Sequence, residues 1–202
     1  MSPDILQSVA REYKMVKRRD QVEETRRRIA KATYELHSTI GPALTTIAMV
    51  SERAGVPRQT VYRNFGTQVE LFRSCIAFGL EMHPLPDPAP WQSITDPGER
   101  LQVGLIQLYR WFEASEPVLT NVARDFGAVQ EAAEVAQRPM AEVMERIHGT
   151  LSHGWEGSAV APLLSLAVDF ATWKKLRREQ GMVSSAIVEM WSDLIRCRNQ
   201  HN

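Results

Sequence analysis

Residues 45–65 read TTIAMVSERAGVPRQTVYRNF, and this stretch decides the fold of the N-terminal part of the chain. Its apolar residues recur at helical spacing in two groups: Ile47, Val50 and Ala54, then Val61 and Phe65. Residues three, four and seven apart lie on one face of a helix, so each group can be buried while the opposite face stays polar. The pattern predicts two short helices packed together at a steep angle, which is the build of a helix-turn-helix.

The turn between the two predicted helices is three or four residues long, as this motif requires. Gly55 falls where the first helix must end in a left-handed conformation, which a residue without a Cβ atom adopts easily. Pro57 suits the opening of the second helix, because its fixed φ is helical. If that helix begins near Arg58, its exposed side offers donors and acceptors for base edges and phosphates: Arg58, Gln59, Tyr62 and Arg63.

From Arg27 to Leu71 the chain resembles, without a gap, the DNA-binding domain of the TetR-type transcriptional regulators. The resemblance is carried by an apolar first helix, a break at Gly41, two consecutive threonines, the stretch AGVPRQTVYRNF and a further helix that opens near Thr67. Two features depart from the family pattern. Pro57 stands where a Ser usually caps the recognition helix, and Gln68-Val69 stands where Lys-Glu usually opens the fourth helix.

The resemblance implies a set of DNA-contacting residues. Phosphates would be held by Thr46, Thr60 and Tyr62, with Thr45 beside them, and bases would be faced by Arg58, Gln59 and Arg63. Gln68, or a backbone N–H at the start of its helix, takes the place of the family's Lys as a phosphate contact.

The net charge is zero over the whole chain but is unevenly distributed. Residues 1–80 hold 13 Lys/Arg against 8 Asp/Glu, a net charge of +5, and residues 81–202 hold 11 against 16, a net charge of −5. A basic N-terminal part attracts duplex phosphate, and an acidic remainder is repelled by it. A cationic cluster precedes the motif: Lys14, Lys17, Arg18, Arg19, Arg26, Arg27, Arg28 and Lys31. We expect this cluster to contact DNA, with Arg27 as its site residue; the alternative is a solvated, charged helix face.

Composition indicates a soluble globular protein of one or two domains, with 202 residues of which 44% are hydrophobic. The longest apolar run, residues 159–168, is far short of the roughly 20 residues that span a bilayer. The N-terminus lacks the pattern of a secretory signal, and there are two cysteines. We therefore expect a cytoplasmic location and no membrane partner.

The stretch HPLPDPAPW, residues 83–91, has Pro at every second position from 84 to 90, so no helix is expected to cross it. It divides the chain into four predicted parts. These are a basic extension (1–20), a helix-turn-helix domain (21–82), a Pro-rich linker (83–91) and a domain for ligand binding and dimerisation (92–202).

The C-terminal part reads as helices throughout, so the predicted fold class is all-α: an N-terminal three-helix domain followed by a helical bundle. One helix is expected to open at Asp96-Pro97, with the chain reopening at Pro117. Another is expected over 131–152, kinked or restarted at Pro139. A third is expected over 163–176 with a stop at Gly181, and a last one around 187–195.

The last two predicted helices have apolar surfaces wider than one buried stripe. The resemblance implies that they pair with their copies in a homodimer. The predicted interface residues are Leu166, Phe170, Trp191, Leu194 and Ile195; the alternative is an ordinary buried core. An aromatic and Met-rich set would line a cavity for a small apolar effector, which the resemblance also implies: Tyr109, Phe112, Phe126, Met144, His148 and Trp173. His148 or Asp125 would be its polar handle, although each residue alone is typical of plain core.

Enzymatic and metal sites find no support in the sequence. Glu145 and His148 form a Glu-x-x-His pair, but a di-iron site needs a second copy, and His148 and His153 point in different directions on a helix. No cofactor is expected. The function predicted is a homodimeric, sequence-specific transcriptional regulator, a repressor on a palindromic DNA operator that the effector releases. The alternative is an activator, or a helical adaptor that uses the same motif without ligand control.

Overall fold

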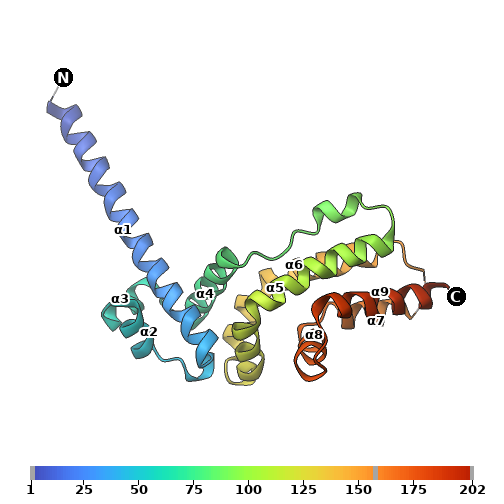
Figure 1. The fold of residues 1–202 in the computed structure, drawn as a ribbon. Coiled ribbons are helices and arrows are strands. Elements are labelled where there is room, and N and C mark those ends of the chain that lie inside the picture. Colours follow the sequence, from blue (N-terminus) through green and yellow to red (C-terminus); the bar gives the residue numbers. More distant parts are fainter. Residues whose placement is uncertain (1–2, 157–158, 201–202) are drawn as a thin grey trace. The chain divides into compact units, whose positions relative to one another are not determined.

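The computed structural model describes residues 3–156 and 159–200, and every regular element in these ranges is helical (Figure 1). This confirms the predicted all-α class. The elements of the first 93 residues are α1 (Pro3–Thr39), η1 (Pro42–Leu44), α2 (Ile47–Ala54), α3 (Arg58–Asn64), α4 (Gln68–Met82) and η2 (Ala89–Ser93). The elements that follow are α5 (Pro97–Asp125), η3 (Phe126–Ala128), α6 (Gln130–Ser152), α7 (Val160–Ala167), α8 (Phe170–Lys174), a π-helical turn η4 (Lys175–Glu179) and α9 (Ser184–Gln200). None of the described helices has the length and apolar content needed to cross a membrane.

The chain forms two compact units that differ from the division expected from the Pro-rich linker. The first contains residues 1–81 and 117–136, and the second contains residues 82–116 and 137–202. The first boundary falls beside the predicted one, but the end of α5 and the start of α6 belong to the first unit. Residues 1–2, 157–158 and 201–202, which fall in the predicted extension and C-terminal domain, lie outside the described residues.

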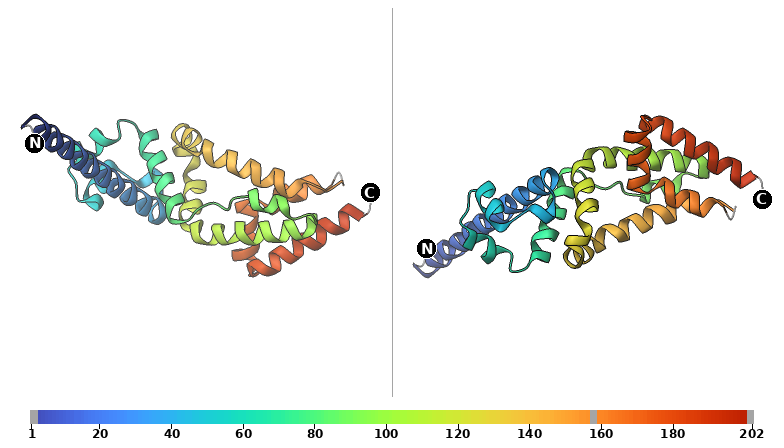
Figure 2. Two further views of the ribbon diagram at one scale, coloured as in Figure 1. Left: turned by 90° about the horizontal axis from the view of Figure 1, so that it is seen from above. Right: turned by 90° about the horizontal axis from the view of Figure 1, so that it is seen from below.

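The core of the first unit is formed where α1 meets the helix-turn-helix. Its buried side chains are Ile29, Ala32, Leu36, Val50, Ala54, Val61, Phe65 and Leu71. These include the two groups of apolar residues that the periodicity placed inside, except that Ile47 is only partly buried. Residues 14–24 of α1 are exposed, and Figure 2 shows this part of the helix reaching past α2 and α3.

The last residues of α5 are hydrogen-bonded to the end of α1 and the turn after it. The Asn121 side-chain amide donates to the carbonyl oxygens of His37 and Ser38, at 2.9 Å each. Arg124 donates to the Ile40 carbonyl at 2.8 Å. Asp125 accepts from the backbone N–H of Ala43 at 3.1 Å. These bonds explain why the end of α5 belongs to the first unit.

The second unit is built around an aromatic cluster between α5 and α8. Phe112 lies 5.5 Å from Trp173 and 5.4 Å from Phe170 between ring centroids, and Tyr109 stacks beside Phe112 at 5.9 Å. The Tyr109 hydroxyl donates to the Ala167 carbonyl at 2.8 Å, so this polar group is paired inside the core. Burial raises the pKa of Tyr109, which keeps its hydroxyl protonated.

The break predicted at Pro117 is wrong, because α5 continues through that proline. Helix α6 covers the helix predicted over 131–152 and contains Pro139. Conversely, the single helix expected over 163–176 is interrupted after Ala167, because the Asp169 carboxylate accepts from the Thr172 N–H at 2.7 Å and caps a new helix, α8. Gly181 has φ 69°, as expected for a residue at which the helix stops.

Candidate nucleic-acid interface

The helix-turn-helix owes its geometry to three local features. The Thr46 side chain caps α2 by accepting from the Met49 N–H at 3.3 Å. Gly55 ends that helix in the left-handed region, with φ 64° and ψ 39°. Pro57 precedes α3 in an extended conformation and accepts from Thr60 N–H at 2.8 Å through its carbonyl. The predicted turn is confirmed, and Pro57 serves as the residue before the first turn of the helix.

Helix α3 has one buried face and one exposed polar face. Val61 and the following Phe65 are buried in the core of the first unit. Arg58, Gln59 and Arg63 are exposed, and within the described residues their side chains make no hydrogen bond or ion pair. Tyr62 is 60% exposed, an unusual position for an aromatic side chain. The exposed face therefore carries donors, acceptors and two positive charges that the protein itself leaves unused.

In contrast to the side chains on the exposed face of α3, some arginines of α1 have partners within the protein. Arg26 donates to the Asn64 carbonyl at the end of α3, and its guanidinium lies 4.5 Å from the centre of the Phe65 ring. Arg27 forms an ion pair with Glu81 of α4 at 2.5 Å. Arg26 thus fixes α3 against α1, and the charge of Arg27 is partly compensated. For Arg27 a DNA contact stays a prediction, and it would compete with Glu81.

Several predicted phosphate contacts come together at a hollow of about 280 Å³ in the first unit. Thr45, Thr46, Tyr62 and Gln68 line it, together with Thr67. The N-terminal ends of α2 and α4 are at this place, since Thr46 caps α2 and Thr67 accepts from the Glu70 N–H at 3.2 Å. Helix N-termini carry partial positive charge and free N–H groups, which suit a phosphate oxygen. Thr60 is half-buried and is not among the residues lining this hollow.

Sequence reasoning missed two residues that shape this surface. Glu70 accepts from the Gly66 N–H at 2.8 Å and completes, with Thr67, a reciprocal cap on α4. The Thr-x-x-Glu spacing of a capping box was the signal that could have revealed it. The role of Arg26 had no local signal, because its partners at 64 and 65 are distant in sequence.

Comparison with known proteins agrees with this geometry. Residues 29–75 match the family model described as "Bacterial regulatory proteins, tetR family". The stretch that contains the helix-turn-helix is therefore similar to this family. No curated protein sequence matches it significantly. Among solved structures it is similar to a chain named "Clostridium perfringens putative fatty acid metabolism regulator", with 19% identity, a TM-score of 0.60, and coverage of 83% of this chain and 96% of that one. At this identity the second likeness concerns the fold.

The residues predicted to bind an effector come from several elements and belong to both units. Tyr109, Phe112 and Trp173 belong to the packed aromatic cluster of the second unit. His148 lies beside Ser165, with 3.3 Å between the ring nitrogen Nε2 and the hydroxyl. Met144 is half-buried on α6, and Phe126, in η3, belongs to the first unit. Asp125, the other candidate handle, is paired with Arg124 at 2.7 Å, and this hydrogen bond lowers the pKa of its carboxyl.

The residues predicted for the dimer interface divide into a buried group and a more exposed group in the second unit. Trp191 and Ile195 are buried within the second unit, with exposures of 6% and 0%. Leu166 and Leu194 are 48% and 36% exposed, and Phe170 is half-buried against Phe112. Helices α7 and α9, which carry the two exposed leucines, pack against each other. Only the exposed members of the predicted set are available to a second copy.

Proposed function

We propose that this protein is a homodimeric transcriptional repressor that binds a palindromic operator through α3 and is released by a small apolar effector. The observation that carries the proposal is the exposed face of α3, where two arginines, a glutamine and a tyrosine have no partner within the described residues. A helix held from behind by Val61 and Phe65 can enter the major groove without changing its own packing. It acts by binding alone, in the cytoplasm, and needs no cofactor.

In this proposal the exposed residues have two different roles. Arg58, Gln59 and Arg63 contact base edges, because guanidinium and amide groups can make paired hydrogen bonds to guanine and adenine. Thr46, Tyr62 and Gln68 hold phosphates beside the starts of α2 and α4, with Thr45 and Thr60 as neighbours. The projecting, basic part of α1 adds contacts to the backbone of the same duplex.

Dimerisation is supported by apolar side chains that the second unit leaves in solvent. Leu166 on α7, Leu194 on α9 and Val183 just before α9 are large hydrophobic residues with exposures of 48%, 36% and 55%. A second copy related by a two-fold axis would cover such a surface with its own equivalent. Two copies of α3 could then contact two half-sites about one helical turn apart, roughly 34 Å.

In this proposal the apolar effector binds in the helical bundle of the second unit. The aromatic cluster of Tyr109, Phe112 and Trp173 is fully packed, so an effector there must displace side chains rather than fill an open space. The name of the Clostridium perfringens protein refers to fatty acid metabolism, and an apolar effector for this chain would be compatible with that chemistry. Release requires that the effector bind more tightly to the form that cannot hold the operator.

The decisive experiment is selection of bound duplexes from a random pool with the purified chain. We expect recovery of an inverted repeat with half-sites centred about 10 base pairs apart. Arg58→Ala should lose the enriched sequence, whereas Arg110→Ala, an arginine of the second unit, serves as a matched control and should recover it. A pool that stays random in low salt would favour the adaptor alternative. Recovery of a single site without a repeat would contradict binding as a dimer.

A further inference from the structure

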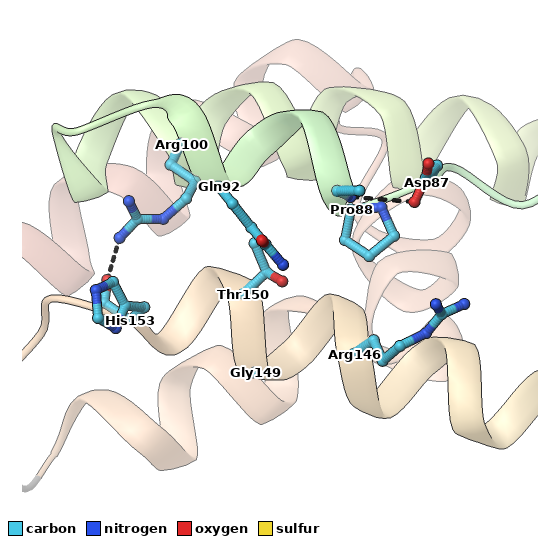
Figure 3. A pocket seen from close by; sticks show the side chains of 9 residues that line it. Asp87, Pro88, Gln92, Arg100, Arg146, Gly149, Thr150 and His153 are labelled. Carbon is cyan, nitrogen blue, oxygen red and sulfur yellow. Dashed lines mark hydrogen bonds between the residues drawn. The ribbon is translucent and has the colours of Figure 1, made fainter.

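A second hollow lies within the second unit, between η2, the start of α5 and the end of α6. Its volume is about 500 Å³, within the range of small-molecule sites. Figure 3 shows Arg100 and His153 at one end, Arg146 and Asp87 at the other, and Gln92 and Thr150 between them. These residues are distant in sequence. Asp87 lies in the Pro-rich stretch and Gln92 and Arg100 follow it, whereas Arg146 and Thr150 lie on α6 and His153 directly after it.

Arg100 is the unusual member of this group. Its side chain is 3% exposed, and two of its guanidinium nitrogens donate to the carbonyl oxygens of Ile94 and His153. Its Nε is buried with no hydrogen-bond partner, and no carboxylate of the described residues forms an ion pair with it. A buried cation that lacks a counter-charge is costly, and a bound anion would reduce that cost.

Part of the role of Arg100 is structural. Its side chain extends from the first turn of α5 to the His153 carbonyl, directly after α6. Free carbonyl groups at the C-terminal end of a helix carry partial negative charge, so a guanidinium is favourable there. This role does not extend to Arg146, which is exposed on α6 and has no hydrogen bond or ion pair within the described residues. The Asp87 carboxylate already accepts from the Ala89 N–H at 3.1 Å. The hollow therefore holds two guanidinium charges against one carboxylate.

We propose that this hollow binds a small hydroxylated molecule that carries an oxyanion, either a carboxylate or a phosphate ester. Arg146 contacts the anionic group directly, because its side chain is exposed and can turn toward it. Arg100 supplies a fixed positive charge, and Thr150 and Gln92 hydrogen-bond the hydroxyl groups. The site goes beyond the proposed function, since it is separate from the aromatic cluster and would exist whether or not the chain represses transcription.

Gly149 provides a way to close the hollow without touching a charge. It lies on α6 among the lining residues, and a Cβ atom at this position would meet no other atom within 4 Å. Gly149→Ala should therefore be tolerated and should add helix stability. Gly149→Phe should extend a ring into the empty space and exclude a ligand while leaving the fold intact.

The test is calorimetric titration of the full-length protein, in buffer without phosphate, with glycerate, glycerol 3-phosphate and glycerol. We expect one of the two acids to bind and neutral glycerol not to, and the acid that binds identifies the anionic group as carboxylate or phosphate. Arg146→Gln should weaken that binding at least about tenfold, as expected for loss of a charged hydrogen bond. Arg138→Gln, the same change at another exposed position of α6, should leave it unchanged.

Gly149→Phe should abolish acid binding, and Gly149→Ala should retain it or weaken it only slightly. The proposal is overturned if neither acid binds better than glycerol, or if Arg146→Gln and Gly149→Phe bind as well as the unmodified chain. A circular dichroism spectrum of each variant establishes that it is folded. Because the readout contains no DNA, failure of operator binding would leave this result unaffected, and failure here would leave the operator proposal unaffected.

Discussion

Helix α3 in the first unit and the aromatic cluster in the second treat their polar groups in opposite ways. On α3 the side chains of Arg58, Gln59 and Arg63 are exposed without partners within the described residues. In the cluster even the Tyr109 hydroxyl is paired, with the Ala167 carbonyl. Exposed hydrogen-bonding groups without a partner in the protein can bind another molecule, whereas buried polar groups that are hydrogen-bonded stabilise the fold. The comparison predicts that changes in the two regions will affect different measurements.

The largest effect is expected for Phe112→Ala. Truncation of a fully buried ring that contacts four other aromatic side chains should cost about 3–5 kcal/mol of unfolding free energy. All five tryptophans lie between residues 91 and 191, within the second unit, so urea unfolding followed by tryptophan fluorescence reports on that unit. Arg58→Ala is the control, and it should change the unfolding free energy measured by fluorescence by no more than about 0.5 kcal/mol. A small loss for Phe112→Ala would mean that the cluster is already loosely packed.

His37 sharpens the comparison, because it is a polar group of the first unit that is buried. Burial lowers its pKa to about 4, an effect that the Asp125 carboxylate opposes. Below the unfolded value of about 6.5 the unfolded chain takes up the proton first, so stability is lost as the pH falls from 6.5 toward 4. The first unit should lose about 2 kcal/mol between pH 7 and pH 5.

That loss is measured by urea unfolding at both pH values, followed by far-ultraviolet circular dichroism. His37→Gln is the control variant, and it should be less stable at pH 7 but should show a flatter pH dependence. If the variant and the unmodified chain respond equally to pH, another group is responsible.

Arg58→Ala tests whether the unused groups of α3 recognise sequence. It should reduce discrimination between the selected operator and a sequence with one substituted base pair by about 1–3 kcal/mol, with no change in unfolding. The measurement is a mobility-shift titration against both duplexes at one salt concentration. An equal loss on the two duplexes would assign Arg58 to the phosphates instead.

Tyr62→Ala should have the smallest effect. A phosphate contact carries no sequence information, so binding to all duplexes should weaken by a similar amount, on the order of 1 kcal/mol. The same titrations check this, with Tyr62→Phe separating the hydroxyl from the ring. Loss of binding to the operator alone would show that the ring contacts a base.

The helix-turn-helix could be predicted because its determinants are local. The spacing of Val61 and Phe65, the left-handed Gly55 and the threonine pair all lie within 21 residues. The face of α3 that stays exposed follows directly from the face that is buried. The same reasoning gave the helical class of the C-terminal part, where apolar residues recur every three or four positions.

What could not be predicted depends on contacts between distant residues. Nothing near Asn121 or Arg124 indicated that they would bind the end of α1, some 84 positions earlier. The sequence around Arg100 did not indicate that its guanidinium would be buried against the carbonyl oxygens of residues 94 and 153. The break before α8 was the exception, since Asp169 three residues before Thr172 is a recognisable helix cap.

The attachment between the end of α5 and the end of α1 has an evolutionary consequence. Asn121 and Arg124 donate to the carbonyl oxygens of residues 37, 38 and 40, and such oxygens are present whatever the side chain. The donors are therefore constrained, while Ser38 and Ile40 are free to diverge as far as these bonds are concerned. Relatives that keep the attachment should show an asparagine and an arginine facing a variable segment, and paired substitutions between the two sides should be rare.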